Sequence, residues 1–96
     1  MKLKELLNGI SILETNVDMD LEVADVAYDS RKVQPGGMFV AITGFATDGN
    51  RFIPMALEKG AVVVVTAVRP QTDIPFVLVE SDRKAQQTLT VNIWVR

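Results

Sequence analysis

MFVAITGFATDGNRFIPMALEKGAVVVV, residues 38–65, is the stretch of sequence that decides the fold. It contains two apolar runs of strand length, Met38–Ile42 and Ala61–Val65. The segment between them, Asn50–Lys59, carries its apolar side chains on one side, which is typical of an amphipathic helix. We expect that helix to start close to Asp48–Asn50, where either side chain can cap it. A strand, a helix and a second strand in this order are the repeating unit of an α/β domain.

Three features are predicted before this stretch. The leucines of residues 3–7 recur at helical spacing and are followed by Asn8-Gly9, which predicts a short helix that ends there. Apolar and acidic residues interleave from Leu21 to Tyr28, which is typical of an edge or half-buried strand. Pro35-Gly36 predicts a tight turn, because proline presets one corner and glycine accepts the positive φ of the next.

Two further elements are predicted after it. Phe76–Val79 has the composition of another short strand. Ser81 is placed to cap a final helix in which Ala85, Leu89 and Ile93 align at a spacing of four residues. The sum is about four strands and about three helices, which predicts a single small α/β domain with a mostly parallel or mixed sheet.

Composition and charge exclude several classes of function. The chain has 96 residues, 48% hydrophobic and 23% charged, with a mean hydropathy of +0.20, which is typical of one small globular domain. Its 10 basic and 12 acidic residues give a net charge of −2. That balance removes the usual basic surface of a duplex-binding protein and argues against a polybasic membrane anchor, although a local basic cluster can still hold a phosphate.

The absence of two residue types narrows the chemistry further. The sequence contains no cysteine and no histidine, which excludes disulfides, thiolate zinc sites and cysteine nucleophiles. The absence of histidine also removes the commonest general base and the commonest metal ligand. The N-terminus does not have the pattern of an export signal, and no apolar run approaches the ~20 residues that a membrane span needs. We therefore expect a soluble chain with no membrane partner.

Two loops are candidates for a binding site, because ligands of such sheets gather beyond the carboxyl ends of the strands. In Asp29–Gly37, Ser30 offers a hydroxyl and Arg31 offers a planar fork for phosphate, whereas a polar turn braced by Asp29 explains the same residues. We favour this structural role for Arg31. In Thr43–Asn50, two glycines bracket a loop that leads into a helix N-terminus, which favours an anion; an ordinary strand-to-helix connection has the same pattern.

Other patterns carry less information. The sequence has neither G-x-x-x-x-G-K-[ST] nor a G-x-G-x-x-G after a strand, so its own residues do not build an ATP cradle. The acidic residues of segment 18–25 allow a divalent-ion surface, but a solvated strand face explains them more simply. Phe39, Phe52 and Phe76 are expected in the core, and Trp94 is expected to cover an edge or to meet a following domain.

A longer ordered pattern joins the two loops. Within residues 26–61 the sequence reads D-S-R, then P-G-x-x-F-V-A, then G-x-x-x-D-G-x-x-F-I. This pattern resembles the N-terminal domain of the Mur ligases, and among them the MurE type, the UDP-N-acetylmuramoyl-dipeptide:amino-acid ligase of peptidoglycan synthesis. The resemblance covers roughly residues 1–85, whereas residues 86–96 diverge from the family pattern.

The resemblance implies that the full enzyme has three domains with different roles. The first holds the uridine nucleotide of the substrate, the central one binds ATP and the last brings the incoming amino acid. Residues 1–96 then form the first domain only, with the central and C-terminal domains absent. No cofactor, metal or catalytic residue is expected in this chain, since ATP and Mg²⁺ are implied only for a full-length parent ligase.

The resemblance also implies the binding residues and the partner. Tyr28 and Ser30 would contact the uracil-ribose end of UDP-N-acetylmuramoyl-peptide, and Phe45, Ala46 and Thr47 would line the nucleotide along the second loop. The expected role is a uridine-nucleotide-binding module of a MurE-like, ATP-dependent ligase of the cytoplasm, serving the cell wall, cell shape and cell division. Such a module is not catalytic alone.

Two alternatives stay open at this point. One is the N-terminal domain of a MurF-type ligase, which shares D-S-R and the D-G-x-x-F stretch. The other is a ligand-free α/β interaction domain that docks through exposed apolar residues near Trp94. Nucleotide binding is expected of the MurE-type and MurF-type domains and not of the ligand-free interaction domain.

Overall fold

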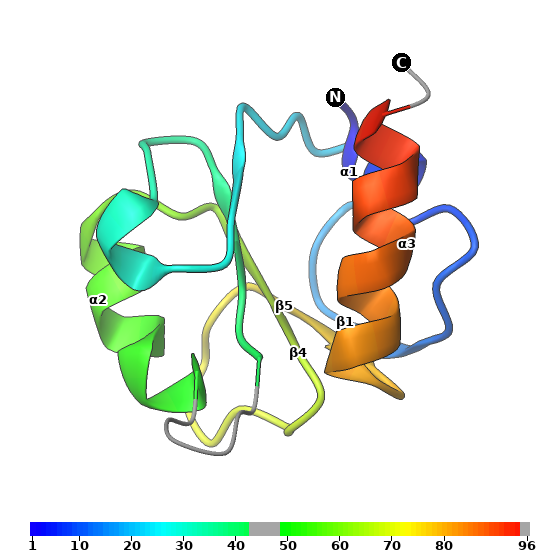
Figure 1. Ribbon diagram of the computed structural model, residues 1–96. Coiled ribbons are helices and arrows are strands. Elements are labelled where there is room, and N and C mark those ends of the chain that lie inside the picture. Colours follow the sequence, from blue (N-terminus) through cyan, green and yellow to red (C-terminus); the bar gives the residue numbers. More distant parts are fainter. Residues whose placement is uncertain (43–48, 95–96) are drawn as a thin grey trace.

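The computed structural model describes residues 1–42 and 49–94 and shows one five-stranded sheet with helices on both of its faces (Figure 1). The strands are β1 (Ile12–Thr15), β2 (Val26–Ala27), β3 (Met38–Val40), β4 (Val63–Thr66) and β5 (Phe76–Val79). The helices are α1 (Leu3–Leu6), α2 (Ile53–Glu58) and α3 (Asp82–Trp94), with 3-10 turns η1 (Ser30–Lys32) and η2 (Gly49–Phe52). The predicted α/β class is confirmed.

The sheet is mixed, with strand order β1-β5-β4-β3-β2. Strands β2, β3, β4 and β5 run parallel, and β1 pairs antiparallel with β5 at one edge. The parallel register pairs Met38 with Val26 on one side and with Val63 on the other. The carboxyl ends of β2 and β3 therefore lie at the same edge of the sheet, where the loop after β2 begins.

The structure corrects the prediction at two strands. Strand β1 was not predicted; its burial alternates irregularly, since Leu13 and Glu14 are both exposed. The strand expected over Leu21–Tyr28 is only the two residues of β2. The backbone before β2 bonds elsewhere instead: the Val23 N–H donates to the Met1 carbonyl at 2.8 Å, and the Ala24 N–H donates to the Gly36 carbonyl at 3.0 Å.

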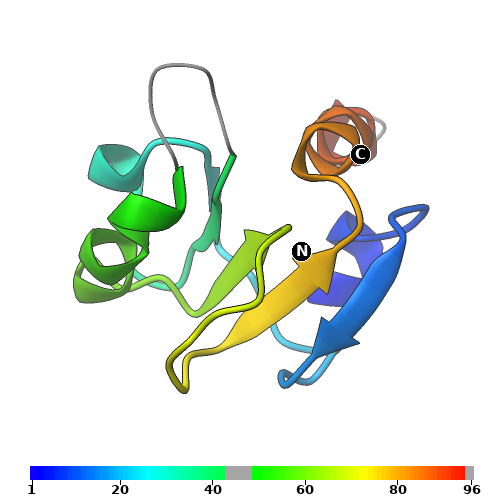
Figure 2. The same cartoon turned by 90° about the horizontal axis from the view of Figure 1, so that it is seen from below.

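Alternate residues of each parallel strand face opposite layers. Met38 and Val40 of β3 pack in the core under α1 and α3, whereas Phe39 packs in the smaller core under α2 and η1. Strand β4 follows the same rule, with Val63 and Val65 on one side and Val64 on the other. Figure 2 shows the same two layers from below, with α2 on one side of the sheet and α1 with α3 on the other.

The helices agree with the prediction in position and differ in detail. The helical run after β3 begins at Gly49, but its first turn is the 3-10 turn η2 and the α-helix begins at Ile53. Pro54 lies in the first turn of α2, where its missing N–H has no intrahelical duty. Ser81 caps α3 as expected, since its Oγ accepts the Lys84 N–H at 3.2 Å.

The apolar row of α3 is buried at its first two members only. Ala85 and Leu89 are buried, whereas Ile93 is 41% exposed. Trp94 at the end of the helix is 83% exposed. Among the residues that the structure describes, no helix is long and apolar enough to cross a membrane.

Candidate functional site

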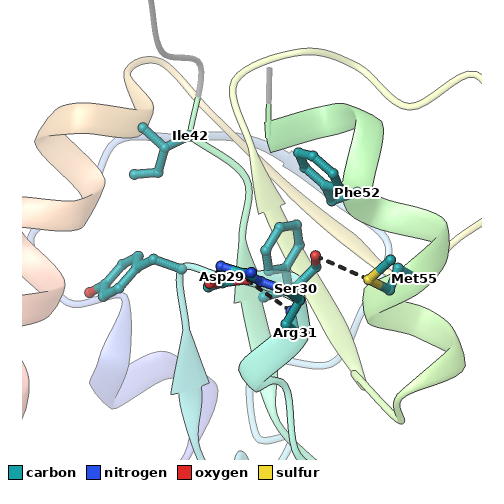
Figure 3. Close-up of a pocket in the computed structure, with 8 residues that line it drawn as sticks. Asp29, Ser30, Arg31, Ile42, Phe52 and Met55 are labelled. Atoms are coloured by element: carbon teal, nitrogen blue, oxygen red, sulfur yellow. Dashed lines mark hydrogen bonds and ion pairs between the residues drawn. The ribbon is translucent and has the colours of Figure 1, made fainter. Parts of the chain in front are cut away.

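A cavity of about 440 Å³ opens beyond the carboxyl ends of β2 and β3, against the first turns of α2 (Figure 3). It is lined by the turn after β2, by the end of β3, by η2 and by the first turn of α2. The lining residues are Tyr28, Asp29, Ser30, Arg31, Phe39, Ile42, Phe52 and Met55. This is the edge of the sheet at which the sequence predicts a binding site.

The turn after β2 is braced by one carboxylate. Asp29 caps η1, and its Oδ1 accepts the backbone N–H of Arg31 at 2.9 Å. The guanidinium of Arg31 binds the same carboxylate in two places, from Nε to Oδ1 at 3.1 Å and from Nη2 to Oδ2 at 2.8 Å. The structural role predicted for Arg31 is therefore confirmed.

This pairing shifts both pKa values. The side-chain hydrogen bond from Arg31, followed by the Arg31 backbone N–H, lowers the pKa of Asp29 from its ordinary 3.8 to about 2. The side-chain hydrogen bond to Asp29 raises the pKa of Arg31. Asp29 is thus ionised at neutral pH, and its two oxygens are engaged within the turn.

Ser30 supplies a buried polar group in the cavity wall. Its side chain is buried, with 4% of the residue exposed. The hydroxyl donates a hydrogen bond to the Met55 sulfur, with 3.4 Å between Oγ and Sδ, as the dashed line in Figure 3 marks. This contact joins the turn after β2 to α2 across the floor of the cavity.

The remaining wall is apolar and aromatic. Phe39 is 1% exposed and belongs to the core under α2, as predicted. Phe52 was expected in the core, but it is only half-buried and lines the cavity. Ile42 continues the apolar wall beyond β3. Aromatic and aliphatic side chains beside the Ser30 hydroxyl are suited to a flat ring that carries a polar edge.

The predicted site residues divide into two groups. Tyr28 and Ser30 both line the cavity, and Tyr28 is 38% exposed there. Phe45, Ala46 and Thr47 lie outside the described residues, so their role stays a prediction. Sequence reasoning did not single out Met55, although its position three residues after Phe52 places both side chains on one side of a helical segment.

The acidic segment 18–25 shows no metal site. Among residues 1–42 and 49–94, no three carboxylates gather as metal ligands would. Asp20 is paired with Lys4 at 2.9 Å, and Glu22 is paired with the N-terminal amino group at 3.3 Å. The hydrogen bond from Lys4 lowers the pKa of Asp20, and the bond to Asp20 raises the pKa of Lys4.

The fold and this cavity define a small α/β domain with a ligand-sized hollow at the carboxyl edge of its parallel strands. A family model described as "Mur ligase family, catalytic domain" matches residues 22–92. The chain therefore belongs to the Mur ligase family.

Its relatives are much longer proteins. The chain is 36% identical over 89 residues to the UDP-N-acetylmuramoyl-L-alanyl-D-glutamate--2,6-diaminopimelate ligase of Listeria monocytogenes, covering 93% of this chain and 18% of that protein. It is 39% identical over 101 residues to the ligase of the same name from Clostridium tetani, covering 98% of this chain and 20% of that protein. The chain thus spans about a fifth of the length of these curated relatives.

A solved structure has the same fold. UDP-N-acetylmuramoylalanyl-D-glutamyl-2,6-diaminopimelate--D-alanyl-D-alanyl ligase from Acinetobacter baumannii matches with a TM-score of 0.78 at 19% identity. The match covers 95% of this chain and 21% of that one. At this identity the likeness concerns the fold alone.

Proposed function

We propose that this chain is a uridine-nucleotide-binding module of a MurE-type ligase, and that the cavity beside Ser30 receives the uridine end of UDP-N-acetylmuramoyl-peptide. The observation that carries the proposal is the cavity of about 440 Å³ that combines a buried hydroxyl with aromatic walls. That volume lies within the range of small-molecule pockets, roughly 300–1,000 Å³. Catalysis is not proposed for these residues alone, because the sequence contains no Walker-type phosphate loop.

The chemistry of the wall supports a pyrimidine nucleotide. Tyr28 and Phe52 offer aromatic faces or edges to a planar base, and Ser30 offers a hydroxyl to its polar edge. Asp29 and Arg31 neutralise each other, so this turn does not repel an anionic diphosphate. The second loop, with Phe45, Ala46 and Thr47, is proposed to complete the nucleotide contacts.

The names of the relatives support the type of ligase. Both relatives described above are diaminopimelate-adding ligases, and the identities of 36% and 39% favour the MurE type over the MurF type. A module of this type would serve peptidoglycan synthesis in the cytoplasm, and through it cell shape and division. The central and C-terminal ligase domains are the partners that a parent enzyme would add.

A titration followed by amide NMR tests the proposal. The 96-residue chain, labelled with ¹⁵N, is titrated with UDP at millimolar concentration. We expect shifts at Tyr28, Ser30 and Met55, and none along α3. ADP is the ligand control, because it carries the same diphosphate on a purine nucleoside. We expect it to produce weaker chemical-shift changes than UDP.

Two serine variants sharpen the test. Ser30→Ala should weaken UDP binding, since it removes the hydroxyl in the cavity wall. Ser11→Ala is the matched control, because Ser11 is exposed and lies outside the cavity. The absence of any UDP-dependent shift near Ser30 would overturn the proposal, as would equal binding by both variants.

A ligand-free interaction domain is the second candidate, and one observation favours it. The end of α3 exposes Val91 at 58% and Trp94 at 83%. If this surface is the functional one, wild type should associate as its concentration rises, Trp94→Ala should stay monomeric, and UDP should change neither result. Sedimentation velocity across a concentration series separates this candidate from the nucleotide-binding module.

A further inference from the structure

The hydrogen bond between Ser30 and Met55 determines what the cavity wall presents to a ligand. A serine hydroxyl has a single proton to donate and two lone pairs that accept. In this structure the proton is directed at the Met55 sulfur, 3.4 Å from Oγ. Ser30 is buried at the first position of η1, where the Asp29 cap fixes the backbone. Among residues 1–42 and 49–94 no group donates to this hydroxyl oxygen, so its lone pairs are available to a ligand.

The neighbouring groups leave this arrangement undisturbed. Both oxygens of Asp29 already accept hydrogen bonds from Arg31, so this carboxylate does not compete for the Ser30 proton. Phe39, Phe52 and Ile42 have no side-chain lone pairs to offer. Among the described side chains that line the cavity, Met55 is the one that accepts from Ser30.

We propose that Met55 is a positioning residue that makes Ser30 a hydrogen-bond acceptor, so that the cavity selects a base edge with a ring N–H donor. The inference rests on the proposed function, since it concerns the base of the nucleotide in the same cavity. Uracil carries such a donor at N3, whereas cytosine has a bare lone pair at that atom. Ser30 oxygen facing N3 then accepts from uracil and repels cytosine.

The sulfur is suited to this role because it is a weak acceptor on a side chain without charge. It orients the hydroxyl and leaves its lone pairs available. Leucine has nearly the volume of methionine, so Met55→Leu removes the acceptor with little change in packing. In that variant the hydroxyl is free to rotate and to donate to the N3 lone pair of cytosine.

The test compares the affinities of UDP and CDP for four proteins by calorimetry or amide NMR. The proteins are wild type, Met55→Leu, Ser30→Ala and the double variant. Wild type should bind UDP more tightly than CDP. Met55→Leu should reduce the UDP-to-CDP affinity ratio by about three- to tenfold, the effect of one neutral hydrogen bond. In the Ser30→Ala background the Met55→Leu change should leave the ratio unaltered, which a purely structural role would not predict.

A matched methionine provides the control. Met19 is half-buried at the edge of the other core, so Met19→Leu should leave the ratio unchanged. UDP binding with the same ratio in Met55→Leu and wild type would overturn the inference and leave the proposed function intact. A higher UDP-to-CDP affinity ratio in Met55→Leu would overturn the inference as well. It would mean that the Ser30 hydroxyl, once released from Met55, donates to an acceptor on uracil. Failure of wild type to bind UDP at all would overturn both.

Discussion

The two faces of the sheet are built from alternate residues of the same strands, yet they are packed differently. The face under α1 and α3 is filled by long aliphatic side chains, with Leu3, Leu6 and Leu89 fully buried against the valines of the strands. The face under α2 and η1 has a smaller core in which alanines predominate: Ala27, Val33, Phe39, Ala41, Ala56, Ala61 and Val64.

The difference explains where the cavity lies. Ala56 is the buried residue of α2, and Phe39 is the largest buried side chain among the described residues on that side. At the start of α2 the wall is completed by half-buried side chains instead, and the cavity opens there. The face under α3 thus contributes the larger core, and the face under α2 contributes a smaller core together with the shape of the site. Changes in the core under α3 should therefore lower stability without affecting binding.

The largest effect is expected from Leu89→Ala. Leu89 is 0% exposed in the core between α3 and the sheet. Its truncation leaves a cavity there and should reduce the free energy of unfolding by about 2–5 kcal/mol, measured by urea denaturation. The folded fraction should still bind UDP, because Leu89 lies on the opposite face from Ser30.

Val91→Ala is the control on the same helix. Val91 is 58% exposed, so its truncation should change stability by no more than about 0.5 kcal/mol. Equal losses in Leu89→Ala and Val91→Ala would show that burial of Leu89 against the sheet is not the source of its contribution to stability.

A smaller effect is expected from Gly60→Ala, on the α2 face. Gly60 has φ +102°, and an added Cβ would lie 2.7 Å from the Pro35 Cα. We expect a loss of about 1–3 kcal/mol from the left-handed backbone, to which the contact with Pro35 adds. Gly9→Ala is the matched variant, since Gly9 has φ +86° but its added Cβ would lie in ordinary contact with Thr88 Cγ2, at 3.6 Å. A loss in Gly9→Ala as large as in Gly60→Ala would show that close packing on the α2 face contributes nothing.

A smaller loss of stability is expected from the hydrogen bonds that join α3 to the end of α1. The Asn92 side-chain amide donates to the carbonyls of Leu6 at 2.7 Å and Asn8 at 2.8 Å. The Leu6 carbonyl is at the end of α1, and the Asn8 carbonyl lies just after it. Asn92→Ala should therefore lower the free energy of unfolding by about 1 kcal/mol, measured by thermal or urea denaturation. Asn92→Asp keeps the size but not the donor and should lose at least as much. Wild-type stability in Asn92→Asp would contradict this role.

The sequence allowed the central strands and the helices to be predicted better than the edge of the sheet. Strands β3, β4 and β5 and the cap of α3 follow from continuous apolar runs and from Ser81, which are strong local signals. Strand β1 was missed because an edge strand with two adjacent exposed residues, Leu13 and Glu14, has no clean alternation. Its place is set by pairing with β5, which is distant in sequence.

The site shows the same limit. Ser30 and Tyr28 were found because the pattern around Asp29-Ser30-Arg31 resembles a known family. Phe52 and Met55 belong to an apolar helical pattern, and periodicity does not distinguish a side chain that fills a core from one that lines a cavity. That distinction depends on which residues from other elements pack against α2, which no local pattern specifies.

The smallest effect is a pH dependence confined to the α2 face. Arg31 lowers the pKa of Asp29 to about 2, against 3.8 ordinarily, so the folded state favours the ionised carboxylate. Its contribution to stability is therefore complete above about pH 4 and is lost as the pH falls toward 2. In melting curves, wild type should exceed Asp29→Asn at neutral pH, and the two should converge near pH 2. Glu14 and Asp20, whose pKa values are also lowered by paired cations, titrate in both proteins and cancel in the difference. A difference that persists unchanged to pH 2 would show that Asp29 acts through its shape as a cap and not through its charge.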